Sequence, residues 1–141
     1  MTGRKTHFEV VPLAEIAPLL QAAPARAILS VSYDTSLART REMLFSNAGF
    51  QVSSVLTVAE AVRECGECAF DLIVIGHSIP LKDRETLVKA LRSRCTTPIL
   101  ALMRPNESAL AGAEYFFDST ESPSLLLETV KDIFRSKNGN S

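Results

Sequence analysis

One short turn holds the first residues of this sequence that could do chemistry. The run Leu72–Ile75 is continuously apolar and is followed by Gly76, His77 and Ser78. An uninterrupted β-branched run is typical of a strand covered on both faces in a parallel sheet. In open α/β sheets, ligands and reactive groups lie at the carboxyl ends of such strands. Gly76 stands at that end, and because it has no side chain it can supply no side-chain chemistry.

A C-x-x-C pair, Cys65 and Cys68, is a second candidate. A redox site favours a first cysteine at a helix N-terminus, where its thiolate is stabilised, whereas Cys65 is predicted near a helix end. A zinc site needs further ligands, and Cys95, His7 and His77 have no fitting spacing. We therefore expect Cys65 to be a core residue and Cys68 a loop thiol. Without an export signal, we expect the cysteines to be reduced.

Composition and charge exclude several classes of function. The 141 residues are 46% hydrophobic and 22% charged, with a net charge of −1, which predicts one soluble globular domain. This balance does not favour nucleic acid or an anionic membrane surface as a partner. No apolar run is long enough to span a bilayer, and no secretory signal is evident, so we expect a cytoplasmic protein.

From Ala27 onward, strand patterns alternate with helical patterns. Strands are expected at 27–33, 50–55, 72–75, 98–103 and 112–117, with helices between them and a last helix from Ser122. The first helix should run to about Asn47, with Leu37, Thr40, Leu44 and Ala48 on its inner face. This alternation predicts an α/β, flavodoxin-like three-layer sandwich around a five-stranded parallel sheet with strand order 2-1-3-4-5.

The ends of the chain differ from this regular pattern. Residues 1–26 contain three prolines and an Ala-rich stretch, and we interpret them as an N-terminal extension that packs on its own domain or as a docking arm for a partner. The domain is expected over 27–137, with its last helix buried along Leu126, Val130 and Phe134. Residues 138–141 are expected to form a polar tail.

Residues 27–134 resemble the receiver domain of bacterial two-component response regulators. FDLIVIGHSIP is similar to the family's third strand and the proline after it, TPILALM to its fourth strand, and GAEYFF with an S-P helix start to its fifth strand and last helix. In that family, an aspartate after strand three accepts a phosphoryl group, and an acid pair after strand one helps to hold Mg²⁺. A Thr or Ser after strand four and a Lys after strand five contact the phosphoryl oxygens.

All of these positions are changed in this sequence. The resemblance places the phospho-acceptor at Gly76, the acid pair at Ser32 and Tyr33, the Thr/Ser at Met103 and the lysine at Ser119. The resemblance therefore implies a degenerate receiver with no catalytic residue, no metal and no cofactor.

Other features of the family are also altered. Arg84 replaces a glycine after the turn, and the short span from Met103 to Gly112 predicts that helix four is shortened or lost. Tyr33 and Met103 are expected to fill the former metal pocket. Asp34 either reaches the mouth of this pocket or caps the first helix.

Two functions follow from these expectations. The first is a non-catalytic pseudo-receiver of a bacterial two-component or phosphorelay system, acting through a protein partner or a homodimer, with no enzyme activity. The alternative is a small-ligand sensor that uses the emptied pocket beside Gly76, Ser32 and Ser119, with His77 and Ser78 as candidate contacts at its mouth.

Overall fold

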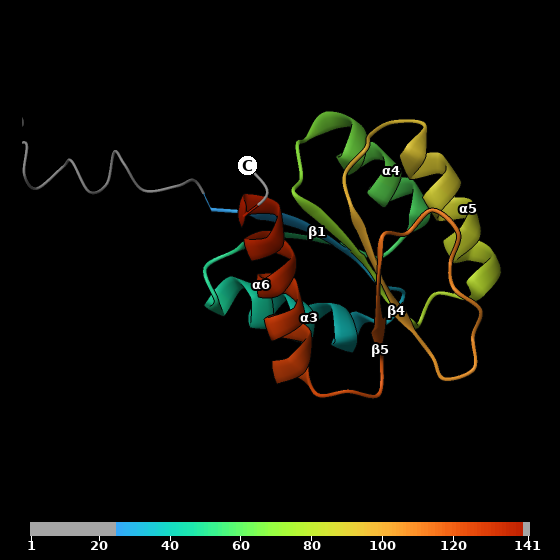
Figure 1. The fold of residues 1–141 in the computed structure, drawn as a ribbon. Helices are drawn as coiled ribbons and strands as arrows, with labels where there is room; N and C mark the ends of the chain where they lie inside the picture. Colours follow the sequence, from blue (N-terminus) through green and yellow to red (C-terminus); the bar gives the residue numbers. More distant parts are fainter. Residues whose placement is uncertain (1–24, 140–141) are drawn as a thin grey trace, which may run out of the picture.

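A computed structural model describes residues 25–139 as strands alternating with helices (Figure 1). The strands are β1 (Ala27–Val31), β2 (Gln51–Val55), β3 (Leu72–Ile75), β4 (Ile99–Met103) and β5 (Tyr115–Asp118). The helices are α3 (Thr35–Asn47), α4 (Val58–Glu67), α5 (Leu81–Arg92) and α6 (Pro123–Gly139). The expected N-terminal arm lies almost wholly outside the described residues. Helix α6 continues to Gly139, into the segment expected to be a tail.

The strands form one parallel sheet with the order β2-β1-β3-β4-β5, which confirms the predicted fold class. Val31 is the register partner of both Val55 and Ile75, and Met103 is the partner of Asp118. Because the strands are parallel, their carboxyl ends meet at one edge of the sheet. The residues that follow β1, β3, β4 and β5 are thus brought together there.

Helices cover both faces of the sheet and create two apolar layers. Helices α4 and α5 cover one face, and α3 and α6 cover the other (Figure 1). Alternation along β3 explains both layers, since Ile73 and Ile75 pack into the first and Leu72 and Val74 into the second. Burying each such side chain contributes about 2 kcal/mol of hydrophobic free energy.

The inner face of α3 differs from the prediction. Its buried residues are Ala38, Arg41 and Phe45, whereas Thr40 is exposed and Leu37 is half-buried. The predicted stripe was wrong because it was read one position away from the true i, i+3, i+7 series. The sequence pattern also gave no reason to expect Arg41, a charged residue, on the buried face of the helix.

Side-chain caps fix where two helices begin. Asp34 Oδ1 accepts a hydrogen bond from the backbone N–H of Leu37 at 3.0 Å, so the helix-cap role expected for Asp34 is confirmed. Thr57 Oγ1 accepts from the N–H of Glu60 at 3.0 Å, and Glu60 Oε1 accepts from the N–H of Leu56 at 3.1 Å. The two bonds resemble a capping box, except that Glu60 accepts from the residue before the N-cap.

No helix lies between β4 and β5 in the described chain, which agrees with the expected loss of helix four. Leu110 is buried and anchors this connection against the core. Arg92 holds its far end by donating a hydrogen bond to Gly112 O at 2.9 Å. Gly112 has a φ of +92°, a conformation that favours glycine.

The expectation of reduced cysteines is wrong for one pair. The structure joins Cys65 on α4 to Cys95, which follows α5, by a disulfide. Cys68 is a free, exposed thiol. Spacing alone pointed to the nearby C-x-x-C pair, but helix packing brings Cys95 to Cys65 across a separation of 30 residues.

Candidate functional site

Gly76 stands at the carboxyl end of the central strand β3, where the site was expected. Its backbone N–H donates to Val31 O at 2.9 Å, and the residue is buried. A Cβ added to Gly76 would lie 2.7 Å from Arg41 Nη1 and 3.1 Å from Val31 O. The guanidinium of Arg41 therefore occupies the space that a side chain at the phospho-acceptor position would need.

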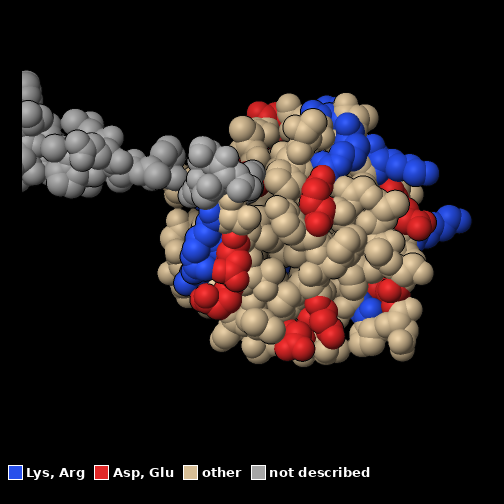
Figure 2. All heavy atoms as spheres, in the orientation of Figure 1, with Lys and Arg blue, Asp and Glu red and all other residues tan. Residues whose placement is uncertain are grey.

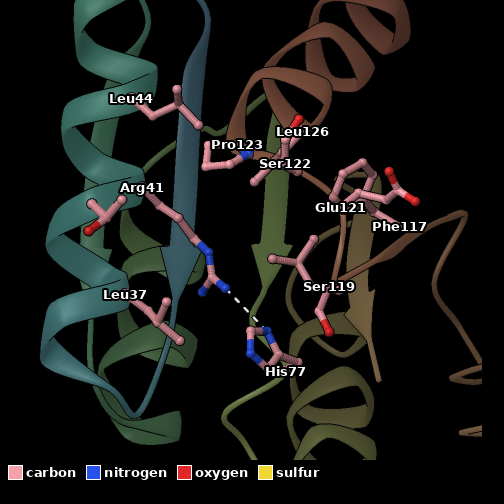
Figure 3. A pocket seen from close by; sticks show the side chains of 12 residues that line it. Leu37, Arg41, Leu44, His77, Phe117, Ser119, Glu121, Ser122, Pro123 and Leu126 are labelled. Carbon is pink, nitrogen blue, oxygen red and sulfur yellow. Dashed lines mark hydrogen bonds between the residues drawn. The ribbon is translucent and has the colours of Figure 1, made fainter. Parts of the chain in front are cut away.

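Arg41 reaches this edge from α3 and is only 6% exposed. Its Nη2 donates to His77 Nδ1 at 3.3 Å (Figure 3). Its Nη1 has no hydrogen-bond partner among the described residues. Burial lowers the pKa of Arg41, and the charge of Asp34 partly offsets that effect. The site thus contains a buried cation whose charge no contacting carboxylate balances.

The pKa of the His77 imidazole lies below its ordinary value. Burial is the main cause of its lowered pKa, and the positive charges of Arg41, Arg104 and Arg84 lower it further. A neutral ring can accept the hydrogen bond from Arg41 while its other nitrogen carries the proton. His77 accordingly orients the guanidinium without balancing its charge.

Arg41 and His77 line a cavity of about 120 Å³ between α3, the end of β5 and the start of α6 (Figure 3). The lining side chains are mostly apolar, with a polar minority. They are Leu37, Thr40, Arg41, Leu44, His77, Leu102, Phe117, Ser119, Glu121, Ser122, Pro123 and Leu126. Ser119 and His77 belong to this lining, but Ser32 and Gly76 do not, so this cavity does not extend along all of the positions expected to line one pocket.

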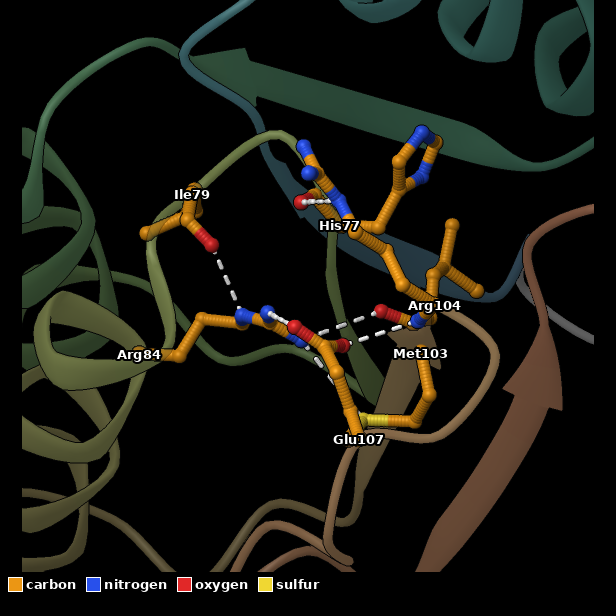
Figure 4. A network of polar contacts seen from close by, with 7 residues as sticks. His77, Ile79, Arg84, Met103, Arg104 and Glu107 are labelled. Carbon is orange, nitrogen blue, oxygen red and sulfur yellow. Dashed lines mark hydrogen bonds and ion pairs between the residues drawn. The ribbon is translucent and has the colours of Figure 1, made fainter.

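A second buried arginine closes the other side of the sheet edge. Arg84 is 1% exposed, and its Nε donates to Ile79 O at 2.7 Å (Figure 4). Its Nη2 pairs with Glu107 Oε2 at 2.6 Å, and its Nη1 lies 3.6 Å from Met103 Sδ. The hydrogen bond from Arg84 is the main cause of the lowered pKa of Glu107. Sequence reasoning recognised Arg84 only as a replaced glycine, because its partner Glu107 lies 23 positions away.

The loop that contains Glu107 is tied to the turn after β3. The backbone N–H of Arg104 donates to Glu107 Oε1 at 2.8 Å, and Arg104 Nε donates to His77 O at 3.2 Å. These contacts cover Met103, which is buried as predicted. The backbone N–H of Ser119 donates to Met103 O at 2.9 Å, which fixes the end of β5 beside β4.

Ser32 and Tyr33, the positions that the resemblance assigns to an acid pair, form hydrogen bonds to other side chains. Ser32 is fully buried, and its Oγ shares a hydrogen bond of 3.1 Å with Ser78 Oγ. Tyr33 is 39% exposed, so the expectation that it fills the former metal pocket is wrong. Its hydroxyl instead donates to Asp83 Oδ2 at 3.0 Å, across the surface. Desolvation, then the hydrogen bond and charge of Asp83, raise the pKa of Tyr33.

Within residues 25–139, no group of three or more His, Cys, Asp or Glu side chains is arranged to hold a metal ion. The acid nearest to β3 in sequence is Asp71, which lies at the amino end of that strand. Its Oδ2 accepts from the backbone N–H of Ala27 at 2.8 Å. Among the same residues, no helix is both long and apolar enough to cross a membrane.

Comparison with solved structures identifies the architecture. The Vibrio cholerae chemotaxis protein CheY4 is 24% identical, with a TM-score of 0.67 over 77% of this chain and 98% of its own. A CheY-like response regulator receiver domain protein from Methanospirillum hungatei JF-1 is 20% identical, with a TM-score of 0.71 over 84% and 100%. The chain has the receiver fold. A two-component response regulator from Clostridium difficile is 22% identical, with a TM-score of 0.71 over 80% and 98%.

Sequence comparison is less extensive. No protein-family model matches the chain. The uncharacterized transcriptional regulatory protein YclJ of Bacillus subtilis (strain 168) is 27% identical over 114 residues, which are 77% of this chain and 50% of that protein. The chain therefore spans about half the length of the curated relative that it matches.

Proposed function

We propose that this chain is a pseudo-receiver, a signalling module that recognises a protein partner without phosphorylation on aspartate. The observation that carries the proposal is the close packing of the Arg41 guanidinium against Gly76 at the end of β3. Gly76 offers no carboxylate, and Arg41 Nη1 would lie 2.7 Å from any Cβ there. A phosphoryl group has neither an acceptor nor the room to reach one.

The surrounding contacts support the same proposal. Mg²⁺ requires hard oxygen ligands, usually carboxylates. Ser32 uses its hydroxyl on Ser78, and Tyr33 directs its hydroxyl to Asp83 at the surface. Arg84 contacts both Met103 and Glu107, so it links the end of β4 to the loop that follows it. The carboxyl-end edge of the sheet thus contains two buried arginines and side chains that bond to one another. We propose that it serves as a fixed scaffold with no enzyme activity.

We propose that the partner is a protein of a bacterial two-component or phosphorelay pathway, or a second copy of this chain. Strand β5 lies at the edge of the sheet, and its Phe116 is 45% exposed beside the connection that lacks a helix. Exposed aromatic side chains are common anchors of protein interfaces. On the face drawn in Figure 2, basic and acidic side chains are interspersed and much of the surface carries neither, which favours a protein over nucleic acid or membrane.

The test is an amide NMR spectrum recorded before and after addition of Mg²⁺ with beryllofluoride, a phosphoryl mimic. We expect no peak to move around Gly76, Ser32 or Ser119. Saturable shifts at these residues would overturn the proposal. Gly76→Asp is the matched control, because it supplies the carboxylate while leaving the acid pair absent. We expect its amide peaks to show no shift on addition of Mg²⁺ with beryllofluoride either.

The oligomeric state separates the two kinds of partner. Light scattering after size exclusion, repeated with Phe116→Ser, tests whether copies associate through β5. A dimer that Phe116→Ser dissociates supports the second copy, whereas a concentration-independent monomer leaves a different protein as the partner. We also propose a cytoplasmic location for the chain.

A further inference from the structure

We propose that the cavity between α3 and α6 binds a small, apolar monocarboxylate whose charge is balanced by Arg41. The proposal goes beyond the pseudo-receiver function, since it concerns a ligand site on one face of the sheet and not the fate of the phosphorylation site. It rests on three features, which are a buried cation without an ion-pair partner among the described residues, a mostly apolar cavity that this cation lines, and the charges at the rim of that cavity.

The buried cation requires an anion. Arg41 is 6% exposed, and its Nη1 has no hydrogen-bond partner among the described residues. A buried charge is strongly destabilising unless it is paired. Asp34, the carboxylate that acts on Arg41 electrostatically, has its Oδ1 engaged by the N–H of Leu37. A carboxylate bound in the cavity that Arg41 lines would supply the missing charge.

The cavity sets the size and polarity of the ligand. Its volume is about 120 Å³. That is the space of about four water molecules at liquid density, which suits a carboxylate with a short branched tail. Leu44, Leu102, Phe117 and Leu126 contribute apolar walls around the aliphatic part (Figure 3). These walls offer no hydrogen bonds, so they favour a hydrocarbon tail over a second polar group.

The side chains and the helix end at the rim of the cavity determine which ligand charge is favoured. Helix α6 begins at Pro123, and its first turn lines the cavity beside Ser119. The partial positive charge of a helix N-terminus adds to the attraction that Arg41 exerts on an anion. Glu121, an exposed side chain, also lines the cavity and repels anions, a dianion about twice as strongly as a monoanion. One carboxylate is therefore favoured over sulfate or a phosphate dianion.

Binding is tested by titrating isovalerate into the full-length chain and following amide NMR shifts. We expect saturable shifts at cavity-lining residues, with a Kd of about 1 mM or tighter. Isovaleramide has nearly the same shape without the charge, and sulfate has charge without the apolar tail. We expect neither of them to saturate. Absence of saturation by isovalerate up to about 10 mM, or equal binding of the amide, would overturn the proposal.

Variants assign the binding to the site. Arg41→Gln should weaken isovalerate binding by about tenfold or more. Arg39→Gln removes an exposed arginine from the same helix and should leave it unchanged. Ser119→Leu keeps every charge but fills the cavity, so it should also abolish binding, which preserves the test if Arg41→Gln fails to fold. Unchanged affinity in Ser119→Leu, or in a folded Arg41→Gln, would show that the ligand lies elsewhere.

Discussion

Gly76 and Arg41 share one small volume at the end of the central strand, because a Cβ on Gly76 would lie 2.7 Å from Arg41 Nη1. The resemblance to receiver domains assigns an anionic position to Gly76, which is here the neighbour of a cation. The absence of a side chain at position 76 and the inward turn of Arg41 are therefore parts of one arrangement. A carboxylate placed at position 76 would meet a guanidinium.

This arrangement predicts a difference between Gly76→Asp and Gly76→Asn. Both side chains must displace the flexible end of Arg41, and both can accept a hydrogen bond from its unpartnered nitrogen, but only the aspartate also balances the charge. We expect Gly76→Asp to be more stable than Gly76→Asn by about 1–3 kcal/mol, because a charge-assisted hydrogen bond is stronger when the acceptor is ionised. Urea unfolding at pH 7 measures the difference.

The control for this pair is the Arg41→Gln background. There the advantage of aspartate over asparagine should vanish, because the cation is gone. An aspartate that is no better than asparagine beside the native Arg41 would mean that the guanidinium does not face Gly76 in solution.

A second prediction concerns the ion pair between Arg84 and Glu107. Arg84 is buried, whereas the Glu107 side chain keeps 20% of its exposure, so water can partly replace the lost carboxylate. We expect Glu107→Gln to lower the free energy of unfolding by about 1–3 kcal/mol, because Arg84 keeps its backbone acceptors but loses its countercharge.

The matched control is Glu128→Gln, which alters an exposed ion pair with Lys131 on α6. Exposed pairs contribute about 0–1 kcal/mol, so this variant should unfold almost like the wild type. Equal stability of the two variants would indicate that the buried position of Arg84 does not depend on Glu107.

The sequence was sufficient to predict the sheet because local and global signals agree there. The β3 run is apolar throughout and was predicted from 72 to 75, where the strand lies. Helix ends were predicted less well. Helix α5 spans Leu81–Arg92 and begins directly after Pro80, whereas its sequence pattern predicts a helix from Asp83 to Arg94. Proline at a helix start supplies no side-chain cap, so its effect on the boundary is harder to recognise than that of Asp34 or Thr57.

The site could be predicted only as a set of missing groups. Gly76, Ser32 and Ser119 show which side chains are absent, but not what replaces them. The replacements, Arg41 and Arg84, come from helices on opposite faces of the sheet, and charged residues on helices usually face solvent. Only tertiary packing shows that Arg41 and Arg84 point inward. The cavity beside Arg41 therefore could not be predicted from the sequence.

The third prediction is a loss of stability in acid that depends on Glu107. The pKa of Glu107 in the folded state is held below its ordinary value of 4.5, chiefly by the hydrogen bond from Arg84. A carboxyl group with a depressed folded pKa stabilises the fold fully above its unfolded pKa. That stabilisation is lost as the pH falls below about 4.5 and through the folded pKa.

Unfolding midpoints in urea at pH 7 and at successively lower pH check this sign. The stability difference between the wild type and Glu107→Gln should shrink as the pH falls. The pKa of Asp118 is also lowered, by hydrogen bonds from Thr120, so the wild type alone would not isolate Glu107. A difference that is constant from neutral to acidic pH would contradict the prediction.

The last prediction concerns the disulfide between Cys65 and Cys95. It closes a loop with a sequence separation of 30 residues, for which the chain-entropy model gives a stabilisation of about 3–4 kcal/mol. Since the loop includes β3 and α5, reduction should lower the melting temperature of the whole domain, by about 10 °C or more. Thermal unfolding followed by circular dichroism, with and without a phosphine reductant, measures the effect.

Two controls separate the disulfide from other effects of reduction. Cys95→Ser should melt at the same temperature with and without reductant, and Cys68→Ser should retain the full response, because Cys68 is the free thiol. A thiol assay on the denatured, unreduced chain should find one reactive thiol of the three cysteines. Three reactive thiols, or a Cys95→Ser variant that still responds to reductant, would show that the two cysteines are not joined and that the stability of this face comes from packing alone.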